Sequence, residues 1–503
     1  MRGPTCRAAS ESPRFSSTSV NHTRFFGQTY RDEFESSIMV WIAKRRVDRP
    51  GSKANMNPSG PTRRNLLGFA GLATASLALP EAAIRAQTVA RRGRPPLKIS
   101  DVKTILIQAD GEHLVIVKVL TNEPGLYGVG CATHSERPLA VAAAIDQHVK
   151  PLLLGKECDR IEDIWQTSYV ASYFRSGVTL NNALSGIDGA LWDILGKQCG
   201  SPVYKLLGGK VREAVPLYAH ASATGLSALE DQVRRWQADG YRHVRVQLSV
   251  PGYATYGAAG ETSMDVQQAR PMAMKPSPVF EPTPYVNNTI KMFEHLRARL
   301  GFDVELIHDV HERVPPVQAI QLAKALEPFR LFFLEDCFAP EDAAWFQHLR
   351  SQTSTPLAMG ELFVNRHEWL PLVTNRWIDF IRLHISAVGG LSMARKVAAC
   401  CELFNVRTAW HGPGNVSPVG HAVNLHLDLA SYSFGIQEQN VFSDTLKGLF
   451  PGAPEIKKGY MYSNDKPGLG IDIDEKVAAK FPYTTPGRNR GTDRRLDGTI
   501  VRP

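Results

Sequence analysis

The 503-residue sequence has no Cys-X-X-Cys motif, no apolar run long enough to span a membrane and no basic stripe interleaved with aromatic residues. The seven cysteines form no Cys-X-X-Cys pair, and Cys400 and Cys401 are adjacent. An odd number without framework spacing argues against a disulfide scaffold and predicts reduced, mostly buried thiols. The net charge is +9, but much of the excess falls in residues 42–98 and 488–495. Nucleic acid is therefore not an expected partner.

The apolar run Leu66–Leu79 has 14 residues, too few to span a bilayer as a helix. It follows TRRNLL at residues 62–67 and precedes small residues up to Ala86. A twin arginine before a modest apolar stretch resembles a Tat export signal. The pattern predicts a periplasmic protein without stable membrane insertion, and a cytoplasmic location is the alternative.

Upstream of this signal, residues 1–55 are polar and irregular. We expect them to be disordered or an over-extended reading frame, since Met56 would give the signal a conventional start. Residues 56–96 then comprise the signal and a linker. The remaining chain is long enough for more than one domain, and 43% hydrophobic with 21% charged residues is an ordinary globular composition.

Residues 97–209 have an α+β pattern. Two apolar strands, residues 98–108 and 113–122, flank the turn ADGEH. Residues 138–155 and 181–200 follow with helical periodicity, because their apolar residues recur at spacings of three and four positions. We expect this segment to form a capping domain that precedes the catalytic part of the chain.

From Val215 onward, short strands alternate with helical segments, as a closed (β/α)8 TIM barrel over residues 210–450 requires. The eight strand candidates are AVPLYAHA, YRHVRVQ, VELIHDVH, LFFLED, PLAMGE, FIRLHI, RTAWHG and FGIQEQ. A Pro/Gly-rich insertion at residues 251–288 follows the second strand, and a connection of that length is typical of a lid or binding loop. Residues 451–503 are expected to return to the capping domain.

Three acidic residues end three successive strands of this barrel at equal spacing. Asp309, Glu335 and Glu361 are separated by 26 residues each, about one strand, helix and loop. Because the carboxyl ends of adjacent barrel strands meet on one face, these carboxylates would repel one another unless a cation lay between them. Oxygen-only acidic ligands suit a hard cation, so the sequence predicts bound Mg²⁺.

The other strand ends also carry groups able to bind or to transfer protons. In chain order these are His220, Arg245 with Gln247, His311 beside Asp309, Arg382 with His384, His411 and Glu438. Positive groups beside the carboxylates indicate an anionic substrate chelated to the metal. A carbon acid next to a carboxylate ionises only when a cation stabilises the resulting enediolate. The reaction then needs a base for the α-proton and, for an elimination, an acid for the departing hydroxyl.

These motifs resemble the enolase superfamily, and within it the mannonate dehydratase branch. The resemblance covers residues 97–503 and rests on the segments ALSGIDGALWDILGKQCGSPVYKLLGGKVRE, HDVHERV, LED, GEL, RLHIS and WHGPGNVSPVG. It implies Mg²⁺ on Asp309, Glu335 and Glu361, and loss of water from a hexonate. D-mannonate or D-gluconate would give 2-keto-3-deoxygluconate. The resemblance also implies a symmetric homo-oligomer that binds a small sugar acid.

The resemblance further implies roles for the remaining residues. Tyr256 would be the general base, with Arg245 beneath it, and His311 the general acid. The residues expected to contact the sugar acid are His220, Glu361, Arg382, His411, Asn415 and Glu438. The choice of base also agrees with physical chemistry, because a guanidinium stays protonated at neutral pH but favours a neighbouring phenolate. Tyr253, in the same insertion, is the alternative base.

The sequence departs from the branch at several positions. Ser135 stands where members commonly have an asparagine that contacts substrate, and Asn415 replaces a carboxylate of the HGPG motif. The loop GCAT and the ending DGTIVRP look like the starvation-sensing-protein subgroup. Two alternatives to a dehydratase therefore stay open. One is an epimerase or racemase with His411 as the second base, and the other is a weakly active or inactive hexonate-binding, regulatory homologue.

Overall fold

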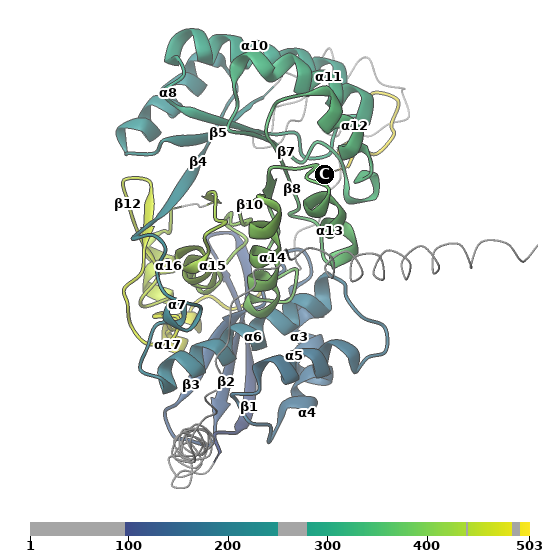
Figure 1. Cartoon of the computed structure of the whole chain (residues 1–503). Helices are drawn as coiled ribbons and strands as arrows, with labels where there is room; N and C mark the ends of the chain where they lie inside the picture. Colours follow the sequence, from purple (N-terminus) through teal and green to yellow (C-terminus); the bar gives the residue numbers. More distant parts are fainter. Residues whose placement is uncertain (1–95, 250–278, 439–440, 485–492, 503) are drawn as a thin grey trace, which may run out of the picture. The chain divides into compact units, whose positions relative to one another are not determined.

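The computed structural model describes residues 96–249, 279–438, 441–484 and 493–502. All of these residues belong to one compact unit, Pro95–Pro503 (Figure 1). The predicted export signal and the insertion that contains Tyr253 and Tyr256 lie outside the described residues. Within the described part, the chain forms a capping domain, a barrel and a C-terminal segment.

The capping domain contains an antiparallel sheet in the order β1-β2-β3. Its strands are β1 (Ile99–Ala109), β2 (Glu112–Thr121) and β3 (Tyr127–Cys131). Asp110 and Gly111 both have positive φ, 53° and 76°, as a two-residue hairpin turn favours. The first two strands and their turn confirm the prediction from the sequence, whereas β3 is an addition to it.

Strand β3 forms despite its two glycines, because they allow it to approach helix α6 (Val178–Gln198). A Cβ at Gly128 would lie 2.0 Å from the carbonyl oxygen of Ala190. A Cβ at Gly130 would lie equally close, 2.0 Å, to the carbonyl oxygen of Gly186. Only glycine therefore fits at either position, and the sheet packs directly on the helix.

The other helices of the capping domain surround this core. The segment predicted as one helix over 138–155 consists of three consecutive pieces: α3 (Pro138–Ala143), a π-helical stretch (Ala144–Val149) and α4 (Lys150–Leu153). Its buried positions recur about every four residues, as in any amphipathic helix. Two further helices are α5 (Ile161–Val170) and α7 (Val203–Leu206).

The barrel contains eight parallel strands in chain order. They are β4 (Val215–Ala223), β5 (His243–Leu248), β6 (Glu305–Asp309), β7 (Phe333–Glu335), β8 (Leu357–Met359), β9 (Phe380–Ile381), β10 (Arg407–Thr408) and β11 (Gln437–Glu438). The barrel closes because β11 pairs with β4 in parallel, and Phe434 bridges Thr408 of β10. Each strand overlaps a predicted segment, with β4 and β5 extending two residues and one residue beyond theirs, so the structure confirms the predicted (β/α)8 barrel.

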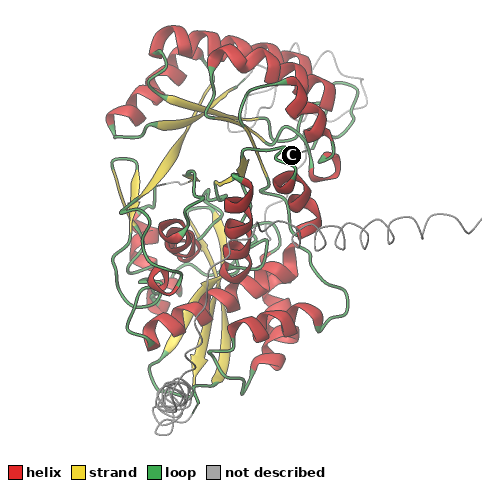
Figure 2. Cartoon of the chain, in the orientation of Figure 1, coloured by secondary structure: helices red, strands yellow, loops and turns green. Residues whose placement is uncertain are grey.

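Helices alternate with these strands along the chain, and Figure 2 shows them outside the strands. They are α8 (Leu226–Ala238), α10 (Pro282–Leu300), α11 (Pro316–Leu326), α12 (Trp345–Gln352), α13 (Arg366–Thr374), α14 (Leu391–Phe404) and α15 (Pro418–Ala430). The predicted insertion at 251–288 ends too late, because α10 already begins at Pro282. A proline in the first turn of a helix loses no hydrogen bond and favours helix initiation.

The C-terminal segment passes from the barrel to the capping domain. Its elements are α16 (Asp444–Leu449), β12 (Glu455–Lys457), β13 (Tyr460–Tyr462) and α17 (Glu475–Ala478). Strand β13 pairs antiparallel with β4, and the backbone N–H of Leu469 then donates to Asp193 Oδ1 of α6 at 2.8 Å. No helix among the described residues is both long and apolar enough to cross a membrane.

Candidate active site

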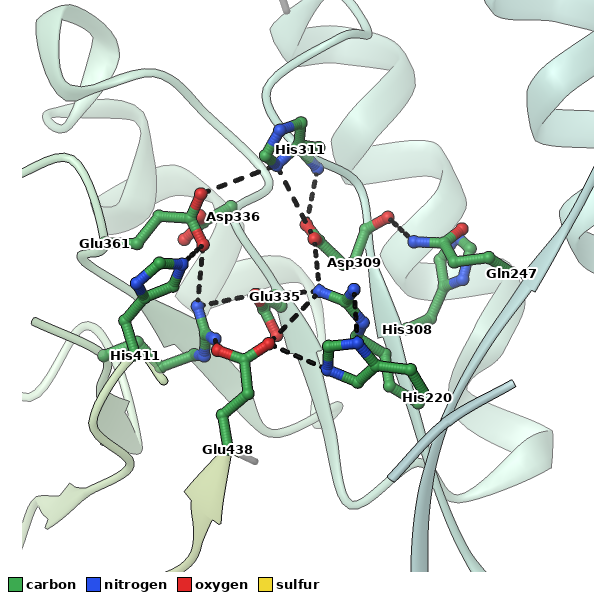
Figure 3. Close-up of polar contacts among 12 residues, drawn as sticks. His220, Gln247, His308, Asp309, His311, Glu335, Asp336, Glu361, His411 and Glu438 are labelled. Atoms are coloured by element: carbon green, nitrogen blue, oxygen red, sulfur yellow. Dashed lines mark hydrogen bonds and ion pairs between the residues drawn. The ribbon is translucent and has the colours of Figure 1, made fainter. Parts of the chain in front are cut away.

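The carboxyl ends of the barrel strands bring most of the predicted site residues into one cluster (Figure 3). The structure places His220 in β4, Arg245 in β5, Asp309 at the end of β6, Glu335 at the end of β7, Glu361 after β8, Arg382 after β9, His411 after β10 and Glu438 at the end of β11. Strand polarity alone explains this, because parallel barrel strands all end on the same face.

Acidic side chains of this cluster form two candidate metal-binding groups. Glu335, Asp336 and Glu361 offer ligand atoms within 4.8 Å of one another. Asp309, His311 and Asp336 form a second group by the same criterion. The three ligands that the sequence predicts are thus divided between two groups, and Asp336 belongs to both.

Asp336 is the residue that the sequence prediction omits. Successive residues of a strand point to opposite faces, so a side chain next to Glu335 is expected to point away from it. The backbone turns at Asp336, however, where φ is 43°. Its Oδ1 accepts a hydrogen bond from the Gly360 N–H at 3.3 Å, and the carboxylate faces the cluster. The Glu-Asp pair that ends LFFLED was the available signal.

Arg382 lies between the carboxylates and is fully buried. Its Nη1 is 2.6 Å from Glu335 Oε1 and 3.1 Å from Glu361 Oε2. Its Nη2 contacts Glu438 and donates to the Tyr218 hydroxyl at 2.8 Å. The guanidinium neutralises carboxylates that would otherwise repel one another, and it occupies space between the predicted ligands.

Arg245 neutralises another side of the cluster. Its Nη1 is 3.0 Å from Asp309 Oδ2 and 3.8 Å from Glu335 Oε1. The same nitrogen is 3.7 Å from Glu438 Oε1, and Nη2 lies 3.4 Å from His220 Nδ1. Arg245 therefore connects β4, β6, β7 and β11 around the barrel.

Burial divides the carboxylates of the cluster into two kinds. It raises the pKa of Asp309 to about 7 despite the nearby arginines. It also raises the pKa of Glu335 and of Asp336 well above their usual values. Burial opposes ionisation of Glu361 too, but His411 and His311 hold the pKa of that group at about 2. Only some of the carboxylates are thus adequately neutralised by the protein itself.

The donor set fits a hard divalent cation. Within the part of the chain that the structure describes, five buried or nearly buried carboxylates (Asp309, Glu335, Asp336, Glu361 and Glu438) face two guanidinium groups, those of Arg245 and Arg382. Both carboxylate oxygens of Glu335 are buried, and among the described residues neither accepts a hydrogen bond of good geometry; Oε1 contacts the Arg382 guanidinium at 2.6 Å, whereas Oε2 has no such contact. Buried charged oxygens without such partners are costly unless a cation contacts them. A hard cation with oxygen ligands would supply the missing charge.

His311 is positioned by an unusual backbone. Its φ is 53° and that of Glu312 is 62°, a region that costs side chains about 1 kcal/mol or more. The His311 N–H donates to Asp309 Oδ1 at 2.8 Å. The imidazole Nδ1 then lies 3.6 Å from Asp309 Oδ2 and 3.7 Å from Glu361 Oε1. The strained turn thus places a proton-transfer group beside the candidate metal ligands.

Two other imidazoles face the cluster. His220 Nε2 lies 2.9 Å from Glu438 Oε1, and His411 Nε2 lies 3.4 Å from Glu361 Oε2. Burial and the charge of Arg245 lower the pKa of His220 to about 4. Burial likewise lowers the pKa of His411, although Glu361 opposes this. Both rings are therefore neutral at pH 7 and able to accept or donate a hydrogen bond.

The remaining predicted residues lie at the margin of the site or outside the described part. Gln247 donates to the Asp309 carbonyl at 2.7 Å and so fixes the end of β6. Asn415 is half-buried in the loop after β10, and Ser135 is buried with its hydroxyl 3.5 Å from Glu112 Oε2. The predicted base, Tyr256, lies outside the described residues.

A closed parallel barrel with a capping domain and an acidic cluster at its strand ends defines a metal-assisted enzyme of the α/β-barrel class. Comparison with known families agrees with this two-domain organisation. Residues 83–208 match the N-terminal domain of the mandelate racemase / muconate lactonizing enzyme family. Residues 228–477 match the enolase C-terminal domain-like family.

Individual proteins that are similar to this chain identify a narrower family within this superfamily. The chain is 51% identical to the D-galactonate dehydratase family member RspA of Pantoea ananatis (strain LMG 20103), over 81% of this chain and 99% of the relative. It is 52% identical, with the same coverage of 81% and 99%, to the family member SEN1436 of Salmonella enteritidis PT4 (strain P125109). The crystal structure of an enolase from Pantoea ananatis with bound D-gluconate and Mg is similar with a TM-score of 0.78. That similarity has 51% identity and covers 81% of this chain and 100% of the other.

The chain belongs to the enolase superfamily and, within it, to the D-galactonate dehydratase family. This confirms the superfamily that the sequence motifs predict.

Proposed function

We propose that this chain is an Mg²⁺-dependent dehydratase that removes water from a hexonate of the gluconate or mannonate type and forms 2-keto-3-deoxygluconate. One observation carries the proposal. The carboxylates of Glu335, Asp336 and Glu361 lie within 4.8 Å of one another, and His311 lies 3.7 Å from Glu361. A cation site and a proton donor therefore share one buried face, as an elimination next to a carboxylate requires.

Magnesium is the cofactor of this site. Asp309, Glu335 and Glu361 would hold it, with Asp336 beside them, and it would supply positive charge to the substrate carboxylate and the developing enolate. The Pantoea ananatis structure with bound D-gluconate and Mg supports both the metal and the substrate class. The two neutral imidazoles, His220 and His411, suit the uncharged hydroxyl groups of a sugar acid.

The chain's own residues account for the proton transfers. Tyr256 takes the proton from C2, and its phenolate is favoured by the positive Arg245. His311 gives a proton to the hydroxyl that leaves C3 as water. The enol that remains tautomerises to the 2-keto acid. Arg382, which already contacts Glu361 at 3.1 Å, lies where it can bind the acidic end of the substrate.

Product stereochemistry distinguishes galactonate from gluconate and mannonate. Gluconate and mannonate differ only at C2, which becomes trigonal, so both give the same product. Galactonate differs from gluconate at C4 and gives the C4 epimer. Incubating the protein with each acid and Mg²⁺, and identifying the keto acids by NMR, tests the proposal. Product from galactonate alone, or no 2-keto-3-deoxy product from any of the three acids, contradicts it.

The roles of acid and base are separated in D₂O. We expect His311→Gln to abolish dehydration while deuterium still enters C2 of recovered substrate, because the base is intact. Deuterated acid of inverted configuration, without keto product from the wild type, would instead identify an epimerase with His411 as its second base. Tight hexonate binding in calorimetry without turnover would identify a binding homologue, which Ser135 and Asn415 favour.

The location of the protein is a separate proposal from the sequence alone. A twin-arginine signal at residues 62–67 would export the folded chain to the periplasm. Changing Arg63 and Arg64 to lysine in a reporter fusion is expected to retain it in the cytoplasm. Export that persists in this variant would exclude the assignment. Sedimentation of the purified protein would test the homo-oligomer that the resemblance implies.

A further inference from the structure

The last described residues form a small hairpin on the barrel. Val501 N–H donates to the Asp493 carbonyl at 3.0 Å, and Arg495 N–H donates to the Thr499 carbonyl at 2.8 Å. Gly498, with φ of 93°, makes the turn. We call residues 493–502 the C-terminal hairpin. Val501 is only 5% exposed and packs into the main hydrophobic core, so the hairpin is part of the folded barrel.

The C-terminal hairpin contacts the segment that leads into α10. Phe280 N–H donates to the Arg494 carbonyl at 2.9 Å, next to a parallel bridge between Val279 and Arg494. Leu496 N–H donates to Glu281 Oε1 at 2.8 Å. These bonds fix the chain just before α10, on the same side of the barrel as the strand ends.

Two ion pairs connect the C-terminal hairpin to loops that follow β6 and β7. Arg313 Nη1 lies 3.0 Å from Asp493 Oδ2, and both side chains are mostly buried, at 9% and 18% exposure. Arg502 Nη1 lies 2.8 Å from Asp342 Oδ2. The hairpin therefore bridges three neighbouring connections at the carboxyl ends of the barrel strands, the face that carries the acidic cluster.

Arg313 lies at the far end of the strained turn that carries His311. The near end of this turn is fixed, because the His311 N–H donates to Asp309 and the Glu312 N–H donates to the Asp336 carbonyl at 2.9 Å. Two consecutive residues with positive φ persist only where the surrounding structure holds them. The buried pair with Asp493 is a restraint on the far end.

We infer that the C-terminal hairpin positions His311, with Asp493 and Arg313 as positioning residues, and that it thereby controls protonation of the leaving hydroxyl. This inference rests on the proposed function of His311 as the general acid. The Asp493–Arg313 pair belongs to the loop after β6. Arg245, which favours the phenolate of the proposed base, lies in β5, and the backbone bonds that hold the segment before α10 do not involve the Asp493 side chain. Loss of the restraint therefore weakens the elimination and leaves removal of the C2 proton largely intact.

The decisive variant is Asp493→Asn, which removes the charge and keeps the shape. Displacement of a catalytic group by about 1 Å can cost up to about a hundredfold in rate. For a weakened restraint we expect kcat for dehydration to fall about tenfold, with little change in KM. In D₂O, the ratio of C2 deuteration to keto product is expected to rise, as in His311→Gln but less completely. Asp493→Glu, which keeps the negative charge, is expected to retain most of the wild-type kcat.

A matched control is Asp444→Asn. Asp444 is a fully exposed carboxylate of α16 whose partner, Lys447 Nζ, is 3.4 Å away. This change is expected to leave kcat and the deuteration ratio unchanged. If Asp493→Asn has the same kcat and the same ratio as the wild type, the inference is wrong. A fall in kcat without a rise in the ratio would also overturn it, since a general loss of structure affects both steps.

A second measurement does not depend on turnover. Hydrogen–deuterium exchange of the peptide that spans residues 305–316 is expected to be faster in Asp493→Asn than in the wild type, while peptides of β8 and β9 are unchanged. Equal protection in both proteins contradicts the inference. A wild type that dehydrates none of the hexonates contradicts the proposed function instead, and the exchange experiment still decides whether the C-terminal hairpin restrains the turn.

Discussion

Replacement of Arg382 by methionine tests how the acidic cluster is neutralised. The guanidinium is fully buried and contacts Glu335 at 2.6 Å and Glu361 at 3.1 Å, besides Glu438. Methionine fills a similar volume but leaves these carboxylates without their shared partner. Removing one partner of a buried ion pair typically costs about 3–5 kcal/mol. We therefore expect the free energy of unfolding of the metal-free protein to fall by that amount.

Magnesium is expected to offset part of this loss. A ligand that binds only the folded state at a hundred times its Kd contributes about 2.7 kcal/mol. Because the variant lacks one positive charge between the same carboxylates, a bound cation replaces part of its electrostatic effect. The loss measured with excess Mg²⁺ is therefore expected to be smaller than the loss measured with excess EDTA.

The assay is urea unfolding followed by circular dichroism, with and without Mg²⁺. The control is Arg299→Met, because Arg299 is 62% exposed and pairs with Glu230 at 3.3 Å. An exposed pair of this kind contributes about 1 kcal/mol at most. If Arg382→Met costs no more than this control, or costs the same with and without Mg²⁺, the account of charge balance in the cluster is wrong.

Three further predictions concern the metal, the pH and the capping domain. Asp336→Asn is expected to weaken Mg²⁺ binding about tenfold or more in calorimetry, and unchanged affinity would remove Asp336 from the site. Because burial raises the pKa of Asp309 to about 7, protons compete with the metal below that pH, so Mg²⁺ affinity is expected to rise between about pH 5 and 7. The free energy of unfolding of the metal-free protein is expected to change with pH in the opposite direction. A carboxyl whose pKa is raised in the folded state contributes stability at low pH that is lost as the pH rises toward 7, and urea unfolding with EDTA measures this loss. Gly130→Ala is expected to destabilise the capping domain by about 1–3 kcal/mol through overpacking against α6, whereas Gly448→Ala, with no atom within 4 Å of the new Cβ, is expected to be neutral or slightly stabilising.

The barrel and the position of the cluster were predictable from the sequence for a simple reason. Each strand is a short apolar run that ends in a polar residue, and parallel strands in a closed barrel all end on one face. The order of the strands therefore suffices to predict that Glu335 and Glu361 lie near each other. The existence of the eight strands was equally predictable, because little besides burial inside a barrel explains eight such runs with helices between them. Their ends were not, since β9 is only Phe380–Ile381 within the predicted FIRLHI.

Backbone turns and charge balance were not predictable in this way. Asp336 follows Glu335 directly, and alternation along a strand predicts that it points away from the cluster, but a positive φ reverses it. The position of Arg382 between the carboxylates depends on the exact height of β9 in the barrel. Strand β3 could not be predicted from the sequence, because glycines are unfavourable in strands. The close approach of α6 explains why Gly128 and Gly130 are nevertheless present in it.

Calorimetric titration of the metal-free full-length protein with Mg²⁺, compared with the same titration of Glu335→Gln, tests the central claim most directly. The variant keeps the size and the neighbours of the buried side chain and removes only its charge. We predict one Mg²⁺ bound per wild-type chain and binding at least about a hundredfold weaker in the variant, since a charged oxygen ligand is lost. Equal affinity in both proteins would show that the strand-end carboxylates do not hold the metal.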